Sequence, residues 1–488
     1  MPAPFALWYF PDGWVSWGVV VVQRRRVIPI VAALVVGCAV TTPVDAAAPA
    51  SIVGCDRDAP SPDAVIEACT VALQDSALKA PARAHLLVIR GQREASSGKS
   101  KAAISDFSEV IELDTKQTQA MNAAAKHGPS GFAQLGNSAE DYVALLNADM
   151  AMAYANRGIA LRRQGELDGA IADLSNALKL APNFPQILVA RATAWRLKGR
   201  PDLALRDLDD AIHASPTDAA ALVSRGRIYS DQGDNDRAIA DFNNAIRLAP
   251  KLYNAYLDRS SARSDMHDYK GAMADLDSAM ALSPNNPSTF FDRAILFSVT
   301  GEIEKAAADY TTVIDLYATG HAGTADYQPG DAARAVAQAV AGRAQAYAEL
   351  GKFAEAEADA DRALQLDPTL YFTWIARCNV RAFGNVELEL ALADCDHAIQ
   401  LAHSKGETAN AFDSRALVRY RQGQFDLAVA DENAAIAGDA GEPGFRYLRG
   451  LAEERIGKAA EGQADIAAAL AADPKLAARY ARLGLRAD

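Results

Sequence analysis

Arginine and aspartate recur along this chain at a spacing that could support charge chemistry. Ten arginines are each followed by an aspartate, at one constant offset in nine copies and one position later in the other copy. A row of guanidinium groups could hold the carboxylates or phosphates of a ligand. Because every arginine has an aspartate of its own, we interpret the pairs as internal ion pairs that set the register of the fold. The pairs are Arg90 and Asp106, Arg157 and Asp173, Arg191 and Asp207, Arg225 and Asp241, Arg259 and Asp275, Arg293 and Asp309, Arg343 and Asp359, Arg377 and Asp394, Arg415 and Asp431, and Arg449 and Asp465.

Four cysteines form a second pattern. Cys55 is close to Cys69 in the sequence, and Cys378 is close to Cys395. If each pair lies on neighbouring segments, both pairs can form disulfides in an oxidising compartment. The alternative is that the thiols are small buried fillers, but the even count favours disulfides. No Cys-x-x-Cys motif occurs and the seven histidines are scattered, so we predict neither a metal site nor a cofactor.

A 34-residue period connects these residues to the elements that must position them. Three copies follow one another without a gap from Ala151, and the first reads AMAYANRGIALRRQGELDGAIADLSNALKLAPNF. This period is typical of one helical hairpin, which cannot bury its own apolar face and must stack on its neighbours. In this frame the arginine stands at position 7 and the aspartate at position 23. Full repeats begin at Ala84, Ala151, Pro185, Ala219, Tyr253, Pro287, Ala337, Tyr371, Ala409 and Pro443.

Small residues and prolines mark the same frame. Position 8 holds Gly, Ala, Ser or Cys, position 20 holds Ala or Gly, and position 32 is proline in six copies. Small residues let two helices approach closely, and proline stops the second helix before the next repeat begins. The pattern resembles the tetratricopeptide repeat (TPR) family. The resemblance implies an all-α fold, a right-handed superhelical solenoid of about ten helical hairpins with a capping helix at each end.

The frame divides the chain into repeats and interruptions. We expect a lone helix over Asp63–Asp75 to cap the first repeat and an amphipathic segment over Leu476–Leu485 to close the last. The predicted organisation is a leader and linker over 1–50, an N-terminal capping segment over 51–83, repeat 1 over 84–117, a degenerate repeat or insertion over 118–150, repeats 2 to 6 over 151–320, an insertion loop over 321–336, repeats 7 to 10 over 337–474 and a C-terminal capping helix over 475–488.

The N-terminal segment has the composition of an export signal. Three arginines, ending at Arg26, precede the apolar run VIPIVAALVVGCAV. Two processing routes fit: cleavage after Ala46, or a bacterial lipobox in which Cys38 becomes the acylated first residue. We therefore predict an exported protein, either in the periplasm or lipid-anchored in the bacterial envelope. Contact with a membrane is expected only through such an anchor or through an uncleaved leader.

The formal charge of −13 and the lack of catalytic motifs narrow the function. An acidic surface repels phosphate backbones, so we predict no binding to nucleic acid. The sequence contains no Gly-x-Ser-x-Gly, no phosphate-cradling Gly-x-x-x-x-Gly-Lys-Ser/Thr loop and no His-Glu-x-x-His. The repeats also leave little chain for a catalytic domain. We therefore predict that the protein is not an enzyme and that its partners are other proteins.

The TPR resemblance also implies where a partner would bind. In that family the first helices line a concave groove, chiefly through positions 2, 5, 9, 12 and 13. A mixture of apolar residues and cations there suits an extended segment that bears a carboxylate, although the arginines are also typical of a solubilising surface. The same face of later repeats carries Phe372, Ile375, Phe383 and Tyr420. Carried over to this chain, the groove residues are Met152, Ala155, Ile159, Arg162, Gln186, Arg196, Val223, Arg227 and Asn254.

We interpret the protein as a non-catalytic scaffold or adaptor that binds an extended peptide or a partner helix in the TPR groove. The alternative is a periplasmic accessory protein of an envelope assembly that binds a small ligand or a glycan. Aromatic stacking faces would favour that alternative, and the groove positions from Met152 to Ser261 contain none.

Overall fold

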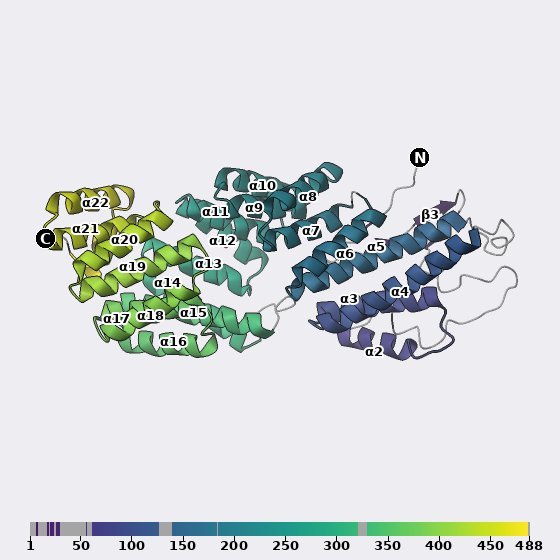
Figure 1. Ribbon diagram of the computed structural model, residues 1–488, viewed down its shortest axis with the longest axis horizontal. Coiled ribbons are helices and arrows are strands. Elements are labelled where there is room, and N and C mark those ends of the chain that lie inside the picture. Colours follow the sequence, from purple (N-terminus) through teal and green to yellow (C-terminus); the bar gives the residue numbers. More distant parts are fainter. Residues whose placement is uncertain are drawn as a thin grey trace. The chain divides into compact units, whose positions relative to one another are not determined.

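The computed structural model describes residues 6–7, 17–18, 20–23, 26–29, 55, 61–125, 139–182, 184–320 and 329–486 (Figure 1). The chain divides into two compact units, Met1–Ala262 and Arg263–Asp488. We refer to them as the N-terminal and C-terminal units and describe each by itself. The described residues contain 22 helices, which confirms the predicted all-α array of helical hairpins.

Four short strands lie between Ala6 and Pro29. Strand β1 (Ala6–Leu7) pairs antiparallel with β2 (Trp17–Gly18), and β3 (Val20–Gln23) pairs antiparallel with β4 (Arg26–Pro29). The predicted apolar run of the leader begins within β4. Its remaining residues, and both predicted processing sites at Cys38 and Ala46, lie outside the described residues.

The N-terminal unit consists of a single helix followed by successive hairpins. Ser61 caps the single helix by accepting a hydrogen bond from the N–H of Ala64. The helices are α2 (Pro62–Ala72), α3 (Ala80–Ser96), α4 (Ser100–Ala125), α5 (Ala139–Arg163), α6 (Leu167–Leu180), α7 (Pro185–Leu197), α8 (Pro201–Ala214), α9 (Ala219–Asp231), α10 (Asn235–Leu248) and α11 (Tyr253–Asp265), whose last residues belong to the next unit.

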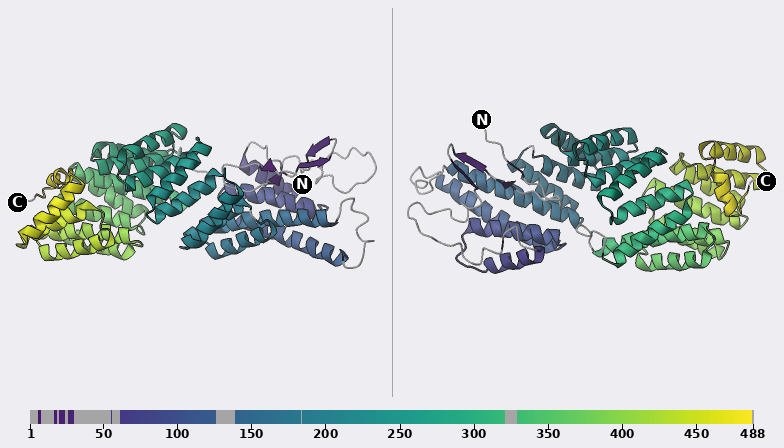
Figure 2. Two further views of the ribbon diagram at one scale, coloured as in Figure 1. Left: turned by 90° about the horizontal axis from the view of Figure 1, so that it is seen from above. Right: turned by 180° about the vertical axis from the view of Figure 1, so that it is seen from behind.

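The C-terminal unit continues the same alternation and ends in one short helix. First helices of successive repeats contact one another, as α15 does with α17 here and α7 with α9 in the N-terminal unit (Figures 1 and 2). The helices are α12 (Tyr269–Leu282), α13 (Pro287–Thr300), α14 (Ile303–Ala318), α15 (Pro329–Glu349), α16 (Phe353–Leu366), α17 (Tyr371–Gly384), α18 (Leu388–Leu401), α19 (Lys405–Arg421), α20 (Phe425–Gly438), α21 (Pro443–Arg455), α22 (Ala459–Ala472) and α23 (Leu476–Arg482).

The two interruptions of the repeat are more helical than the frame suggests. Helix α4 runs to Ala125 and α5 begins at Ala139, so much of 118–150 lengthens the helices on either side of it. The predicted loop over 321–336 is too long, because α15 already begins at Pro329. The alanines of Ala332–Val336 have a high helix propensity and extend the first helix of repeat 7 towards its N-terminus.

Glycine at two kinds of position allows the hairpins to form. At the turns, Gly165 and Gly233 adopt φ values of 81° and 77°, a left-handed conformation that residues with a Cβ disfavour. At position 8 the reason is contact between helices, because a Cβ on Gly226 would lie 2.6 Å from Cε1 of Phe242. A larger residue at this position would push the two helices of the hairpin apart.

Two disulfides lie where the cysteine spacing favoured them. Cys55 is bonded to Cys69 of α2, and Cys378 of α17 is bonded to Cys395 of α18. The Cα atoms are 4.8 Å and 5.6 Å apart, within the usual range for a disulfide. The second bond therefore joins the two helices of one hairpin, and both of its cysteines are fully buried.

No helix among the described residues has both the length and the apolar composition that crossing a membrane requires.

Candidate partner-binding faces

The arginine at position 7 and the aspartate at position 23 form bidentate pairs in repeat after repeat of the part of the chain that the structure describes. In repeat 3, Arg191 donates from Nε to Asp207 Oδ2 at 2.8 Å and from Nη2 to Oδ1 at 2.6 Å. The side chain of Asp207 is only 8% exposed. These arginines are therefore occupied by internal partners. Further pairs of this kind are Arg90–Asp106, Arg157–Asp173, Arg225–Asp241, Arg293–Asp309, Arg343–Asp359, Arg377–Asp394, Arg415–Asp431 and Arg449–Asp465.

A third hydrogen bond links most of these pairs to the preceding hairpin. Nη1 of Arg225 donates to Asp209 Oδ1 at 2.8 Å, and Nη1 of Arg191 donates to Ser175 Oγ at 3.2 Å. Both acceptors stand at position 25 of the preceding repeat, and the sequence prediction missed their role. A polar residue recurs at that position and was the available signal. Further acceptors of this kind are Ser108, Asn243, Thr311, Asp361, Asp396 and Asn433.

Four of the predicted groove residues are buried and cannot contact a partner from the groove. Met152, Ala155, Ile159 and Val223 are each at most 7% exposed. Met152 belongs to a cluster with buried side chains of α3 and α4, and Ile159 packs with Phe107 of α4. The prediction is wrong for these four, because their short or apolar side chains pack against neighbouring helices.

Two arginines of the predicted groove are partly exposed and bring positive charge to this face. Arg196 of α7 pairs with Asp231 at 2.8 Å, and Arg227 of α9 pairs with Asp258 at 2.8 Å. These contacts join first helices of successive repeats within the N-terminal unit. Each arginine is still about a third or more exposed.

Arg162 is the most confined of these cations. Its Nε is buried and has no hydrogen-bond acceptor among the described residues. Burial, followed by the like charges of Arg163 and Arg196, lowers the pKa of the Arg162 guanidinium. Gln186 and Asn254 are partly buried, and Oε1 of Gln186 likewise lacks a donor among the residues the structure describes. This face of the N-terminal unit therefore concentrates cations that a carboxylate would stabilise.

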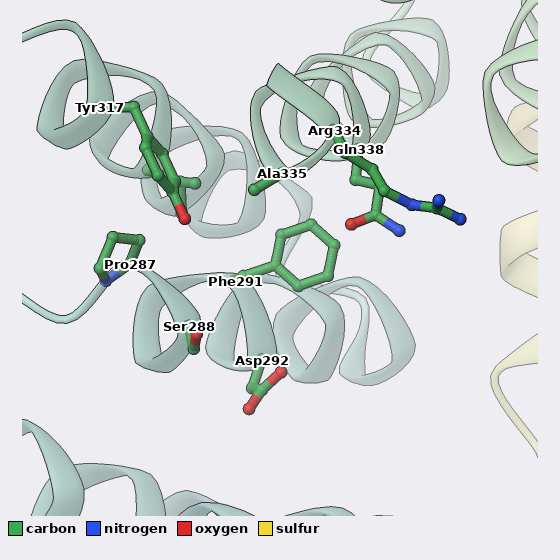
Figure 3. A pocket seen from close by; sticks show the side chains of 9 residues that line it. Pro287, Ser288, Phe291, Asp292, Tyr317, Arg334, Ala335 and Gln338 are labelled. Atoms are coloured by element: carbon green, nitrogen blue, oxygen red, sulfur yellow. The ribbon is translucent and has the colours of Figure 1, made fainter. Parts of the chain in front are cut away.

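The C-terminal unit has a cavity of about 320 Å³ between α13, α14 and α15 (Figure 3). The ring of Phe291 stands between α13 and α15, and Tyr317 of α14 points its hydroxyl towards the same space. Asp292, Arg334 and Gln338 supply polar groups around it. Phe291 and Gln338 occupy positions 5 and 2 of repeats 6 and 7, so the cavity opens at the positions that the TPR resemblance assigns to the groove.

The residues predicted on the same face of later repeats differ in how far they are buried. Phe383 lines a second cavity of this unit, whereas Ile375 and Tyr420 are buried, at 4% and 9% exposure. Phe372 packs partly buried against a cluster that includes Tyr310. Among the described residues, no group of three or more His, Cys, Asp or Glu side chains could hold a metal ion.

Stacked helical hairpins, locked by bidentate ion pairs and indented along their first helices, define a helical repeat protein. Family models described as tetratricopeptide repeat match residues 151–184, 191–253, 223–287 and 337–370, which cover repeats 2 to 5 and repeat 7. These five repeats are therefore tetratricopeptide repeats. Proteins with this fold generally bind other proteins.

Several solved structures are similar to parts of this chain. A tetratricopeptide repeat protein from Parabacteroides merdae is 18% identical, with a TM-score of 0.43 over 55% of this chain and 98% of that one. The Cut9–Hcn1 assembly of the APC/C is 14% identical, with a TM-score of 0.46 over 86% and 79%. Yeast Tom70 is 15% identical, with a TM-score of 0.41 over 74% and 86%. A search of curated proteins returns no match.

Proposed function

We propose that this protein is a non-catalytic adaptor that holds an extended peptide or a helix of a partner protein along its first helices. The observation that carries the proposal is the position of its cavities. The 320 Å³ cavity opens at positions 2 and 5 of repeats 6 and 7. A smaller one of about 20 Å³ lies between α7 and α9, beside Arg196 and Arg227. The larger cavity, with apolar walls and a few polar groups at its rim, is suited to anchoring a side chain of a peptide.

The residues around the larger cavity indicate which side chain it would hold. Phe291 and Tyr317 offer aromatic surface, while Asp292 and Arg334 offer opposite charges. An apolar side chain of the peptide would fill the space between the rings, and the peptide backbone could hydrogen-bond with Gln338 and Ser288. In the N-terminal unit, the arginines at Arg162, Arg163 and Arg196 would instead hold a carboxylate of the same partner or of another one.

We further propose that the adaptor is exported and works in the periplasm or at the bacterial envelope. Two disulfides support this, because such bonds persist in oxidising compartments and are rare in the cytosol. The basic and apolar leader composition supports it independently. Mass spectrometry of the mature N-terminus from cells would test it. Cleavage near Ala46 or acylation of Cys38 would support export, and an intact leader in the cytosol would contradict it.

Site-directed photo-crosslinking in cells tests the adaptor function. A benzophenone amino acid at Gln338 would face the cavity, and the same residue at Leu427 of α20 serves as the control on an exposed second helix. We expect one or a few discrete protein adducts from position 338 and none of these from 427. Identical adducts from both positions, or none from 338 in a folded and exported protein, would contradict the proposal.

One observation favours a second candidate function, the binding of a glycan. Phe291 and Tyr317 form an aromatic recess with Asp292 and Gln338 at hydrogen-bonding positions, a combination that also suits a sugar ring. The two candidate functions can be distinguished by whether soluble cell-wall fragments compete with the crosslinked partner. Adducts at position 338 that disappear when soluble cell-wall fragments are added would favour the glycan, and adducts that persist would favour the protein partner.

A further inference from the structure

A second cavity of the C-terminal unit, about 200 Å³ in volume, lies among the first helices of the last four repeats and α23. Glu349 of α15 and Phe383 of α17 stand at position 13 of their repeats, and Asp413 of α19 stands at position 5. Glu442 lies immediately before α21. The walls thus combine apolar surface with several carboxylates, all from the first-helix face of this unit.

The carboxylates differ in how well they are satisfied. Glu349 binds Nη2 of Arg479 at 3.2 Å, and Glu442 accepts the N–H of Gly444 at 3.1 Å. Oδ1 of Asp413, by contrast, is buried and receives no hydrogen bond from an N–H or hydroxyl group of the described residues. Its neighbour Glu432 can supply a hydrogen only as a protonated carboxyl, so the negative charge of the pair stays buried, and a ligand with a cationic donor would offset that cost.

The neighbour of Asp413 is another carboxyl group. Glu432 of α20 is fully buried, and burial together with Asp413 raises the pKa of Glu432 well above its ordinary value. Burial also raises the pKa of Asp413 to about 6. At neutral pH the two therefore share one proton and one negative charge. With Glu349 and Glu442 against Arg479, the walls hold two negative charges in excess of the positive ones.

Helix α23 shows which chemistry this face accepts. Its preceding residue, Lys475, donates to the carbonyl oxygen of Thr300 at 3.1 Å, at the C-terminal end of α13. Arg479 reaches Glu349 on α15, and the hydroxyl of Tyr480 donates to the carbonyl oxygen of Gly444 at 3.2 Å. A basic segment with an aromatic residue already lies on this surface, and none of these three hydrogen bonds supplies a donor to Oδ1 of Asp413.

We propose that this cavity binds the side chain of a lysine or arginine from a partner, with the charged group at Asp413 and the alkyl part against Phe383 and Leu417. Long basic side chains combine an apolar stem with a charged end, which matches a recess with apolar walls and a carboxylate. The inference rests on the proposed protein-binding function only in assigning this side chain to a partner protein. It gives the C-terminal unit a specificity opposite to that of the arginine-rich face in the N-terminal unit.

Two small probes test the cavity without knowledge of the partner. N-acetyl-arginine amide presents the guanidinium without free termini, and N-acetyl-citrulline amide has nearly the same shape without the charge. We expect titration calorimetry of the full chain to show saturable binding of the arginine probe and about tenfold weaker binding of the citrulline probe. Absence of binding at millimolar concentration, or equal binding of both probes, would overturn the proposal.

Variants locate the binding. Asp413→Asn should weaken binding of the arginine probe about tenfold, whereas Glu461→Gln, at an exposed acidic residue of α22, should leave it unchanged. Thermal unfolding should show that Asp413→Asn folds, because the amide has nearly the same shape as the carboxyl and can still accept a hydrogen bond from Glu432. If it does not fold, Glu442→Gln replaces it, and undiminished binding by whichever variant folds would overturn the proposal.

The experiments can refute the adaptor function and the proposed site for a basic side chain independently of each other. Probe binding that depends on Asp413, together with no protein adduct at position 338, would leave a cation site and refute the adaptor. The reverse result would retain the adaptor and refute this cavity as its recognition site.

Discussion

The two units share one set of structural residues and differ in the charges that line their first helices. In the N-terminal unit these positions hold Arg162, Arg196 and Arg227, and in the C-terminal unit the cavity holds Glu349 and Asp413. The pair between positions 7 and 23 is nevertheless the same in both, as in Arg191–Asp207 and Arg343–Asp359. Residues that lock the hairpins and residues that face a ligand therefore occupy separate positions of the repeat. This separation lets one scaffold carry binding faces of opposite charge.

If the ion pairs are purely structural, breaking one should lower the free energy of unfolding by the same amount in either unit. Asp207→Ala and Asp359→Ala each leave a partly buried arginine without its carboxylate, and we expect each to lower the free energy of unfolding by about 3 kcal/mol. Urea unfolding followed by circular dichroism measures this. The double change Arg191→Met and Asp207→Leu should recover most of the loss, since it leaves no unpaired charge. A cost confined to one unit would break the equivalence of the two.

Removing either disulfide should lower the stability of its unit by a similar amount. The two disulfides close loops of 14 and 17 residues, so loop entropy predicts a loss of about 3 kcal/mol when either is replaced by two alanines. The intact chain should also gain about 4 Da on reduction, two hydrogens per bond, a change that mass spectrometry measures. Because Cys378–Cys395 joins two packed helices, its removal should reduce cooperativity within the C-terminal unit. A variant without Cys55–Cys69 that unfolds like the wild type would show that α2 contributes little to the N-terminal unit.

Charge reversal distinguishes the two faces by what they bind. Arg196→Glu should weaken binding of a fluorescein-labelled peptide of alternating glutamate and alanine about tenfold, because it removes a charge-assisted hydrogen bond. Binding of the arginine probe to the C-terminal unit should not change. The Arg196–Asp231 pair is substantially exposed, so the loss of stability should stay below about 1 kcal/mol. A larger loss would assign Arg196 to the fold rather than to recognition.

Mild acidification should move stability and binding in opposite directions. The pKa of Asp413 is raised to about 6 in the folded chain, so the folded state binds its proton more tightly than the unfolded state does. Stability from this group therefore increases as the pH falls from about 7 towards 4, by on the order of 1 kcal/mol. The arginine probe should dissociate over the same range, since it needs the charged carboxylate.

Other charged groups around Asp413 bear on this test. Those that face it are Glu349 of α15, Glu432 of α20, Glu442 and, on α23, Arg479 and Tyr480. Asp413→Asn is the control, because it should remove the part of both pH dependences that Asp413 contributes. The N-terminal unit has a comparable group in Asp114, whose pKa burial raises to about 7. Urea unfolding at pH 5 and pH 7 would show whether both units gain stability on acidification, and no gain in either would contradict this account.

The repeat, its hairpins and its internal ion pairs follow from spacings within a single repeat. The period determines that position 7 and position 23 lie at similar heights on two antiparallel helices, so the sequence alone pairs Arg157 with Asp173. The spacing within the hairpin likewise places Cys378 opposite Cys395. Contacts inside one hairpin depend on the fixed number of residues per helical turn, so the spacing of two residues in the sequence is enough to predict them.

Contacts between hairpins depend on how successive units rotate and pack, and no local spacing records that geometry. Packing buried Met152, Ala155 and Ile159, which a family rule would have placed in a groove. It also brought Nη1 of Arg225 to Asp209 of the preceding repeat, and it set Asp413 against Glu432 beneath α23. Burial, pKa shifts and cavities arise only when several helices enclose a side chain together. The candidate binding faces therefore emerged from the packed array, whereas the array itself could be predicted from its repeating residues.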